Sequence, residues 1–410
     1  MKSCRTLGIV LGVILAACSV DAQDHLVVIS PHWEGIKTEF RRAFGEWYQK
    51  KTGRNVEMDW RDMGGASDDQ RFIISEFQQR PESIGIDMFF GGGMDPYVDL
   101  KQRGLLAAWK PLASLMDGIP ANISGLPLYD PQGEWYGAAL SSFGILKNDR
   151  VAREMKLPDV KTWRDLANPA LKTWVGSGDP RNSGATHMVY ESILQAYGWD
   201  EGWKVILGMG ANVRQFDRSG STAAKACSVG NVAYSVVVDF YGFTQIAEVG
   251  AENMSLVFPS GESILNPDAI AILKGAPNRA VAEKFLEFVL SDDGQGLWLA
   301  PLGSPRGPKK FAIQRMSVRP KLYEEFAGVT QVKINPFKDL KPLPYDSALG
   351  SLRWSPLNAL LGAVVIDRAP EQRAKAKIPV TSEQLSTLAK GDWKDPIQRN
   401  QILLKWQQQR

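Results

Sequence analysis

The stretch HLVVISPHWEGIKTEFRRAFGEWYQKKTGRNVEMDW, residues 25–60, predicts a strand, a helix and a second strand in succession. Residues 25–30 form a β-branched apolar run typical of a buried strand, and residues 55–60 predict the second strand. Apolar side chains between them recur at helical spacing until Gly53, a residue type that commonly ends a helix. Because a parallel crossover needs a long connection, this order predicts a parallel sheet covered by helices. The apolar positions of the predicted helix are Ile36, Phe40, Ala43, Phe44 and Trp47.

The same alternation continues along the chain and predicts two α/β units. Residues 86–93 predict a third strand of the first unit. In the middle of the chain, strand-like residues 173–178 and 231–240 flank a predicted helix over 185–197 that ends at Gly198. The predicted fold class is therefore α/β.

Two extended stretches, residues 135–148 and 257–277, are the predicted crossings between these units. An apolar stripe at helical spacing follows from Ala282 to Val289, so we expect the chain to return to the first unit. Two lobes joined by two crossing strands form a hinge over a central cleft, where small ligands commonly bind. The expected limits are 24–138 and 266–410 for lobe 1 and 139–265 for lobe 2.

Length and charge limit the classes of function. The 410 residues suffice for two domains, and 23% charged residues are ordinary for a globular chain. The formal net charge is +3, without a basic block or an acidic tail, so composition gives no support for a nucleic-acid partner. We therefore expect a small-molecule partner.

The amino terminus predicts an export signal, because a basic start precedes an apolar run over residues 7–17 that is too short to span a bilayer. Leu15-Ala16-Ala17-Cys18 resembles a bacterial lipobox, in which residues 1–17 are removed and Cys18 is lipidated. Cleavage after Ala22, which would give a soluble periplasmic protein, is the alternative. We expect a periplasmic or cell-envelope location, with Cys18 as the membrane anchor.

The stretch GSGDPRNSGATH, residues 176–187, places turn-forming residues where a predicted strand meets a predicted helix. Asn182 or Ser183 suits an N-cap, and Gly184 permits close approach of backbone amides to a ligand. Free N–H groups and the positive end of the helix dipole favour an anion or a carbonyl oxygen there. The alternative is that these residues only cap the helix and pack.

Four segments in this order resemble the bacterial extracellular solute-binding proteins of the ferric-ion-type group, the substrate receptors of ABC importers. The resemblance covers residues 25–308 and implies a two-lobed, type II periplasmic-binding-protein fold and an ABC permease as partner. We expect a monomer. The segments are VVISPHWEGIKTEFRRAFGEWYQKKTG (27–53), DMFFGGGMDPYVDLKQRGLLAAW (87–109), GSGDPRNSGATHMVY (176–190) and ILNPDAIAILKGAPNRAVAEKFLEFVLSDDGQGLW (264–298).

The resemblance implies only part of an iron site. In ferric receptors of this group a histidine after the first strand, an acidic residue after the third and two adjacent tyrosines ligate iron. His32 matches, but glycines 91–93 stand at the acidic position and Phe240 and Tyr241 at the tyrosine pair. Ferric iron is a hard ion that needs several oxygen ligands, so we do not expect a standard ferric site. Iron held by His32 and Tyr241 with an added anion remains the alternative.

The remaining cleft residues suit a small anionic solute, such as a phosphorylated, phosphonate or carboxylate compound, bound by lobe closure. Arg181 is the expected side-chain cation and Trp33 an apolar wall, although a rim position and simple packing are the structural alternatives. For Asp239 the structural alternative is helix capping. The predicted ligand-binding residues are Pro31, His32, Trp33, Gly91, Gly92, Gly93, Ser141, Ser142, Arg181, Asn182, Ser183, Gly184, Thr186, Asp239 and Tyr241.

An enzyme is the competing class, and the sequence gives it little support. Nucleophile elbow, zinc-type histidine spacing and kinase loops are all absent from the sequence, and Cys227 has no neighbouring histidine. The sequence therefore predicts no catalytic residues and no cofactor. A third class is a ligand-sensing receptor for a membrane signalling partner, whose folded receptor would look the same.

Overall fold

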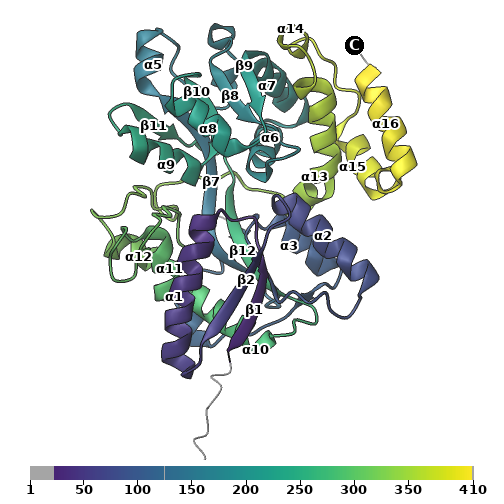
Figure 1. Cartoon of the computed structure of the whole chain (residues 1–410). Coiled ribbons are helices and arrows are strands. Elements are labelled where there is room, and N and C mark those ends of the chain that lie inside the picture. The colour runs from purple at the N-terminus through teal and green to yellow at the C-terminus, as the bar shows by residue number, and fades with distance from the viewer. Residues whose placement is uncertain (1–22, 124, 409–410) are drawn as a thin grey trace, which may run out of the picture.

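The computed structural model describes residues 23–123 and 125–408, and these form two lobes arranged one above the other (Figure 1). The predicted signal and Cys18 lie outside the described residues. Each lobe has its own cluster of buried apolar side chains. We use lobe 1 for the part packed on the first cluster and lobe 2 for the part packed on the second.

Lobe 1 begins with the predicted parallel strands. Strand β1 (Asp24–Ile29) pairs in parallel with β2 (Val56–Arg61) on one side and with β3 (Met88–Phe90) on the other. The third strand is shorter than the expected 86–93, because the glycines at 91–93 all adopt positive φ and turn the backbone out of the sheet.

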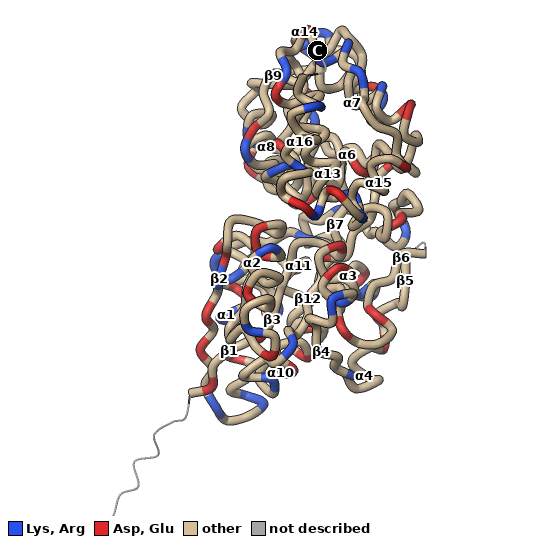
Figure 2. The backbone as a smooth tube through the Cα atoms, turned by 90° about the vertical axis from the view of Figure 1, so that its right-hand side faces the viewer, with Lys and Arg blue, Asp and Glu red and all other residues tan. Residues whose placement is uncertain are grey.

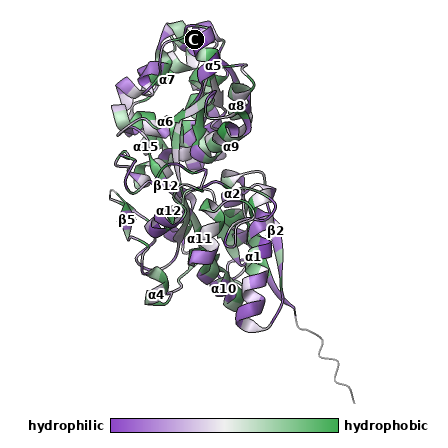
Figure 3. Cartoon of the chain, turned by 90° about the vertical axis from the view of Figure 1, so that its left-hand side faces the viewer, coloured by the Kyte–Doolittle hydropathy of each residue, from purple (hydrophilic) through white to green (hydrophobic). Residues whose placement is uncertain are grey.

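Helices cover this sheet as the apolar spacing predicts. In α1 (Glu34–Thr52), Ile36, Phe40 and Phe44 are buried, and Gly53 ends the helix in the left-handed region at φ 72°. The buried rings pack against α10 (Arg279–Leu290), which carries the predicted stripe of the return segment. Figure 3 shows the mixture of hydrophilic and apolar residues along α1 that such one-sided burial requires. Lobe 1 also contains α2 (Ala66–Gln79), α3 (Asp95–Gln102), α4 (Ala113–Met116), α11 (Asp292–Leu299), α12 (Pro320–Glu325), β4 (Leu106–Ala107), β5 (Asn122–Ile123) and β6 (Leu126–Pro127).

Two segments connect the lobes, and the first of them is one long strand. The 13-residue strand β7 (Tyr136–Asn148) pairs through residues 136–142 with β12 (Leu265–Leu273) and through residues 143–148 with strands of lobe 2. The sheet order β2-β1-β3-β12-β7-β10-β8-β9 therefore runs through both lobes. The second connection is the segment between β11 (Met254–Val257) and β12. Both expected crossings are confirmed.

Lobe 2 contains the second predicted α/β unit. Strand β10 (Tyr234–Val238) pairs with β7 and β8 (Val175–Gly178), and the expected strand 231–240 is shorter because α9 (Asp239–Val249) already begins at Asp239. The other elements are α5 (Asp149–Glu154), η1 (Arg164–Ala167), η2 (Pro169–Leu171), α6 (Gly184–Tyr197), α7 (Trp199–Asn212), β9 (Val213–Asp217) and α8 (Gly220–Ser228).

The last segment differs from the expectation that residues 266–410 all belong to lobe 1. Helix α13 (Ser347–Leu361) contributes Leu357, Leu360 and Leu361 to the lobe 2 cluster. Burial of these apolar side chains in the lobe 2 cluster is the physical reason. The stretch Ser347–Ile366 is long and apolar enough to cross a membrane by length and composition alone, but most of it is buried inside the fold. The segment continues with η3 (Gly362–Ile366), α14 (Pro370–Arg373), α15 (Ser382–Lys390), η4 (Asp392–Lys394) and α16 (Pro396–Gln408).

Positions of Lys and Arg are interspersed with positions of Asp and Glu along the backbone of both lobes (Figure 2). This mixture agrees with the formal net charge of only +3.

Candidate functional site

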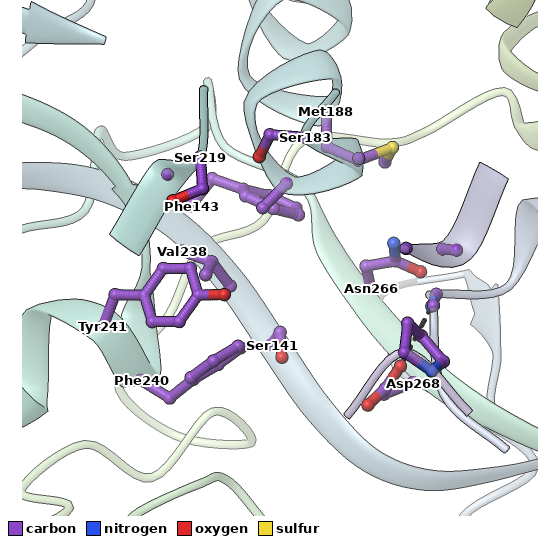
Figure 4. A pocket seen from close by; sticks show the side chains of 18 of the residues that line it. Ser141, Phe143, Ser183, Met188, Ser219, Val238, Phe240, Tyr241, Asn266 and Asp268 are labelled. Atoms are coloured by element: carbon purple, nitrogen blue, oxygen red, sulfur yellow. Dashed lines mark hydrogen bonds between the residues drawn. The ribbon is translucent and has the colours of Figure 1, made fainter. Parts of the chain in front are cut away.

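A cavity of about 260 Å³ lies between the lobes, and residues of both lobes form its wall (Figure 4). Ser141, on the middle of β7, lies between the walls that the two lobes contribute. Nine of the predicted ligand-binding residues line this cavity: Pro31, His32, Gly92, Gly93, Ser141, Asn182, Ser183, Gly184 and Tyr241.

Helix N-termini from both lobes meet at the cavity wall. Helices α1, α2 and α3 begin close to it in lobe 1, and α6, α8 and α9 begin close to it in lobe 2. The arrangement follows from the α/β topology, in which helices start where strands end at one edge of the sheet. The first N–H groups of each helix have no partner within the helix, so the cavity is surrounded by backbone donors and positive dipole ends.

The α6 terminus combines helix capping with access to the cavity. The Ser183 Oγ accepts hydrogen bonds from the Thr186 N–H at 3.2 Å and from Thr186 Oγ1 at 3.0 Å. Ser183 is therefore the N-cap, as one of the two predicted roles requires, and it also lines the cavity. Its own hydroxyl hydrogen remains able to donate to a solute.

The α8 terminus lies directly beside the α6 terminus. Ser219 caps α8 by accepting from the Thr222 N–H at 3.2 Å. A Cβ atom at Gly220 would lie 3.4 Å from Ser183 Oγ and 3.6 Å from the Tyr241 ring, so the two helix ends and this ring are neighbours. Burial raises the pKa of Tyr241, which keeps its phenol neutral and able to donate. The N-termini of α6 and α8 and the hydroxyl groups of Ser183, Ser219 and Tyr241 thus surround one corner of the cavity.

The lobe 1 wall is built on a buried charged group. Asp268 Oδ2 lies 2.8 Å from His32 Nε2 and 2.5 Å from Arg315 Nη1. Burial alone raises the pKa of Asp268, but the charge of Arg315 and the contact with His32 outweigh it and hold this pKa well below its usual range. Burial lowers the pKa of His32 and outweighs the opposing effect of Asp268, so the imidazole is neutral beside an Arg315–Asp268 ion pair.

Arg315 connects this ion pair to the rest of the cavity. Its Nη2 donates to Ser141 Oγ at 2.7 Å, and its guanidinium lies 4.5 Å from the centre of the Phe240 ring. Its Nε is buried, and the described residues provide no hydrogen-bond partner for it. Arg315 therefore links the Asp268 ion pair to Ser141 and Phe240 of the cavity wall.

The glycines 91–93 mainly make room for the side chains of this wall. A Cβ at Gly91 would lie 2.7 Å from the His32 ring, and one at Gly93 would lie 2.7 Å from Asn266 Nδ2. The Gly93 N–H donates to Asp268 Oδ1 at 2.9 Å. Gly91 and Gly93 thus make room for His32 and Asn266, while Gly92 and Gly93 also line the cavity, so the predicted approach of a ligand to these glycines stays a prediction.

Six predicted residues do not line the cavity. Trp33 is 46% exposed and packs against Phe311, while Arg181 forms ion pairs with Asp179 and Asp367. The others lie behind the wall: Gly91 supports His32, Ser142 donates to the Ile264 carbonyl, Thr186 donates to Ser183, and Asp239 is buried with its Oδ1 accepting from the Phe240 N–H.

Several cavity residues were not predicted from the sequence. Asn266 and Asp268 are polar residues within the otherwise apolar stretch ILNPDAIAIL. Polar residues in a buried strand need hydrogen-bond partners, so this pattern could have indicated their place in the site. Arg315 and Trp354 had no such signal, because their neighbours in the sequence do not resemble a binding motif. The remaining unpredicted lining residues are Gly64, Gly65, Ala66, Phe143, Ala185, Met188, Ser219, Gly220, Val238 and Phe240.

The contacts of His32 do not favour a role as a metal ligand. Both ring nitrogens of His32 have partners, Ser30 Oγ at 3.1 Å and Asp268 at 2.8 Å, and the Arg315 cation lies beside them. Within residues 23–123 and 125–408, no group of three or more His, Cys, Asp or Glu side chains is placed to hold a metal ion.

Comparison with known proteins identifies relatives of two kinds. The phosphoglycerate transport regulatory protein PgtC of Salmonella typhimurium is 29% identical over 220 residues, which are 51% of this chain and 54% of that protein. The iron uptake protein A2 of Synechocystis is 29% identical over 215 residues, which are 48% of this chain and 57% of that protein. The chain thus matches little more than half the length of each.

A solved structure and a family model give the wider relationship. The periplasmic binding protein AfuA from Actinobacillus pleuropneumoniae, solved with fructose-6-phosphate bound, superposes with a TM-score of 0.66 at 19% identity, covering 85% of this chain and 100% of AfuA. It confirms the two-lobed, type II periplasmic-binding-protein fold. The family model described as bacterial extracellular solute-binding protein matches residues 83–311, more than half of the 410 residues. The chain belongs to this family of bacterial extracellular solute-binding proteins, and its role is that of a solute receptor.

Proposed function

We propose that this receptor serves a bacterial ABC importer and binds a small solute through a phosphate or carboxylate group. The observation that carries the proposal is the meeting of the α6 and α8 N-termini with Ser183, Ser219 and Tyr241 at one corner of the cavity. Two helix ends and several hydroxyl donors form the kind of site that holds an oxyanion in proteins.

The distribution of charge favours lobe 2 as the place of the anionic group. No carboxylate lines the lobe 2 wall among the described residues, and Asp239, at the start of α9, lies buried behind it. In lobe 1 the charge of Arg315 is compensated by Asp268. The lobe 1 wall then suits the neutral part of the solute, with the Asn266 amide as a donor to hydroxyl or carbonyl oxygens.

The relatives support a phosphorylated solute. PgtC is a phosphoglycerate transport protein by name, and AfuA was solved with a sugar phosphate. Other relatives are iron uptake proteins, so a ferric receptor that uses an added anion is the alternative. The contacts of His32 with Ser30 and Asp268 favour the phosphorylated solute.

Calorimetric titration of the purified protein tests this proposal. We expect 3-phosphoglycerate or fructose 6-phosphate to bind, and glycerate and fructose to bind at least about tenfold more weakly, because each lost charge-assisted hydrogen bond costs about 1.5–3 kcal/mol. Binding of ferric citrate with no binding of any phosphorylated or carboxylate compound would contradict the proposal.

A sensing role is the second candidate, favoured by the word regulatory in the name of PgtC. Reconstitution of the receptor with an ABC permease from the same bacterium distinguishes the two. An importer receptor stimulates ATP hydrolysis by the permease when the solute is present, whereas a sensing receptor does not.

We further propose that the chain is a monomer that is anchored to the membrane through Cys18 and has no catalytic activity or nucleic-acid partner. Support for the absence of catalysis comes from the two candidate reactive groups. His32 is fully engaged, and burial raises the pKa of the Cys227 thiol, so neither group is available as a base or nucleophile. Mass spectrometry of the mature protein tests the lipid anchor, and an unmodified amino terminus near Gln23 would contradict it.

A further inference from the structure

A third connection between the lobes lies in the C-terminal part of the chain, beyond the residues that the family model matches. Tyr345 Oη donates to Asp95 Oδ2 at 3.0 Å, and Ser351 Oγ donates to Asp95 Oδ1 at 3.0 Å. Asp95 is the first residue of α3 in lobe 1 and is buried. One carboxylate of lobe 1 therefore receives two hydroxyl groups from the segment that begins α13.

The same helix is fixed to lobe 2. Arg353 forms a buried, two-pronged ion pair with Glu191 of α6, with Nη2 2.6 Å from Oε1 and Nε 2.9 Å from Oε2. Asn358 Oδ1 lies 2.6 Å from His187 Nδ1, also on α6. Because these contacts are buried and the C-terminal half of α13 packs in the lobe 2 cluster, separation of the lobes would break the packing of α13 against α3 of lobe 1.

Trp354 lies between these two sets of contacts. Its ring stacks on His187 with ring centres 3.8 Å apart, and its Nε1 donates to Ser67 Oγ of α2 in lobe 1 at 3.2 Å. A Cβ at Gly184 would lie 3.5 Å from this ring, so Trp354 is next to the α6 terminus proposed to hold the anion. Trp354 is thus a wall of the cavity that touches both lobes.

We propose that Tyr345, Ser351 and Trp354 form a clasp that holds the lobes together around the solute, and that Trp354 limits the size of the solute. Opening of the hinge must break the three hydrogen bonds to Asp95 and Ser67, because donor and acceptor belong to different lobes. The clasp then slows solute release. The size limit rests on the proposed function, whereas the clasp itself rests only on contacts between the lobes.

Small-angle X-ray scattering without any solute tests the clasp. We expect the double variant Tyr345→Phe/Ser351→Ala to have a larger radius of gyration than the wild type, because the lobes are no longer held together. The matched control is Ser355→Ala on the same helix, since Ser355 accepts only from Trp393 Nε1 within the C-terminal segment. Equal scattering of the wild type and the double variant would overturn the clasp.

Titration with two phosphate probes of different size tests the role of Trp354. We expect Trp354→Ala to lower the ratio of the dissociation constants of fructose 6-phosphate and 3-phosphoglycerate about tenfold or more, because removal of several ring carbons enlarges the cavity. Trp354→Phe, which keeps a ring, should change the ratio much less. An unchanged ratio in Trp354→Ala would overturn the size limit. If the wild type binds neither phosphate probe, the proposed function is wrong. The scattering of the wild type and the double variant then still shows whether the clasp holds the lobes together.

Discussion

Arg315 Nη1 lies 2.5 Å from Asp268 Oδ2, and both side chains are buried beside the cavity at 3% and 8% exposure. The isolated bridge between Leu140 and Met316 places Arg315 against β7, while Asp268 belongs to β12. The ion pair therefore joins the segment after α11 to β12, beside β7, and both strands contribute residues to the cavity wall. Its partners His32 and Ser141 are oriented by the same guanidinium and carboxylate.

Removal of one partner of this ion pair should destabilise the protein. We expect Arg315→Met to lower the free energy of unfolding by about 3–5 kcal/mol, because the Asp268 carboxylate would be left buried without its cation. Urea unfolding measures the change. The double variant Arg315→Met/Asp268→Asn removes both charges and should recover most of the loss; recovery of none of it would contradict this explanation.

Substitution of Ser183 separates capping from solute binding. Ser183→Ala should lower the free energy of unfolding by about 1 kcal/mol through loss of the α6 cap, and it should weaken phosphate binding about tenfold to a hundredfold. Ser291→Ala is the matched control, because Ser291 caps α11 by accepting from the Gly294 N–H at 3.2 Å and does not line the cavity. It should lose similar stability and keep its affinity. Equal affinity of both variants would remove Ser183 from the site.

The buried Asp239 should make stability depend on pH. Burial raises the pKa of Asp239 to about 7, so between about pH 4 and pH 7 the folded protein holds a proton that the unfolded chain has lost. The free energy of unfolding therefore falls as pH rises through this window, by at most about 1.4 kcal/mol per pH unit from this group.

Asp239→Asn, which keeps the oxygen that accepts from the Phe240 N–H, should lack this contribution. We expect the stability of the variant relative to the wild type to increase between pH 5 and pH 8 in thermal or urea unfolding. A difference that stays constant over this range would contradict the raised pKa of Asp239.

The protein should not retain ferric iron tightly. His32 is engaged with Ser30 and Asp268, and Phe240 supplies no oxygen ligand. After incubation with ferric citrate and dialysis against a moderate chelator, we expect no bound iron by elemental analysis and no ferric-tyrosinate absorption. Stoichiometric retention that His32→Ala abolishes would establish the iron alternative instead.

The local elements and their order were determined by the sequence itself. The apolar spacing from Ile36 to Phe44 with Gly53 after it predicted α1, and the structure confirms it. The strand at 173–178 and the turn after it predicted a helix from about residue 185 with Asn182 or Ser183 as its N-cap, and the structure begins α6 at Gly184 with Ser183 as the cap. These features depend on the period of the backbone and on hydrogen bonds between residues a few positions apart, so the sequence pattern alone is sufficient to find them.

The partners across the cavity were decided only by the tertiary structure. Arg315 reaches His32 over 283 positions and Trp354 reaches Ser67 over 287, and no local pattern distinguishes this arginine or this tryptophan from others in the chain. The docking of α13 on lobe 2 is of the same kind, because an apolar helix face can be buried against either lobe. Contacts of this kind follow from which surfaces pack together and which buried charges find partners, and these are properties of the assembled fold.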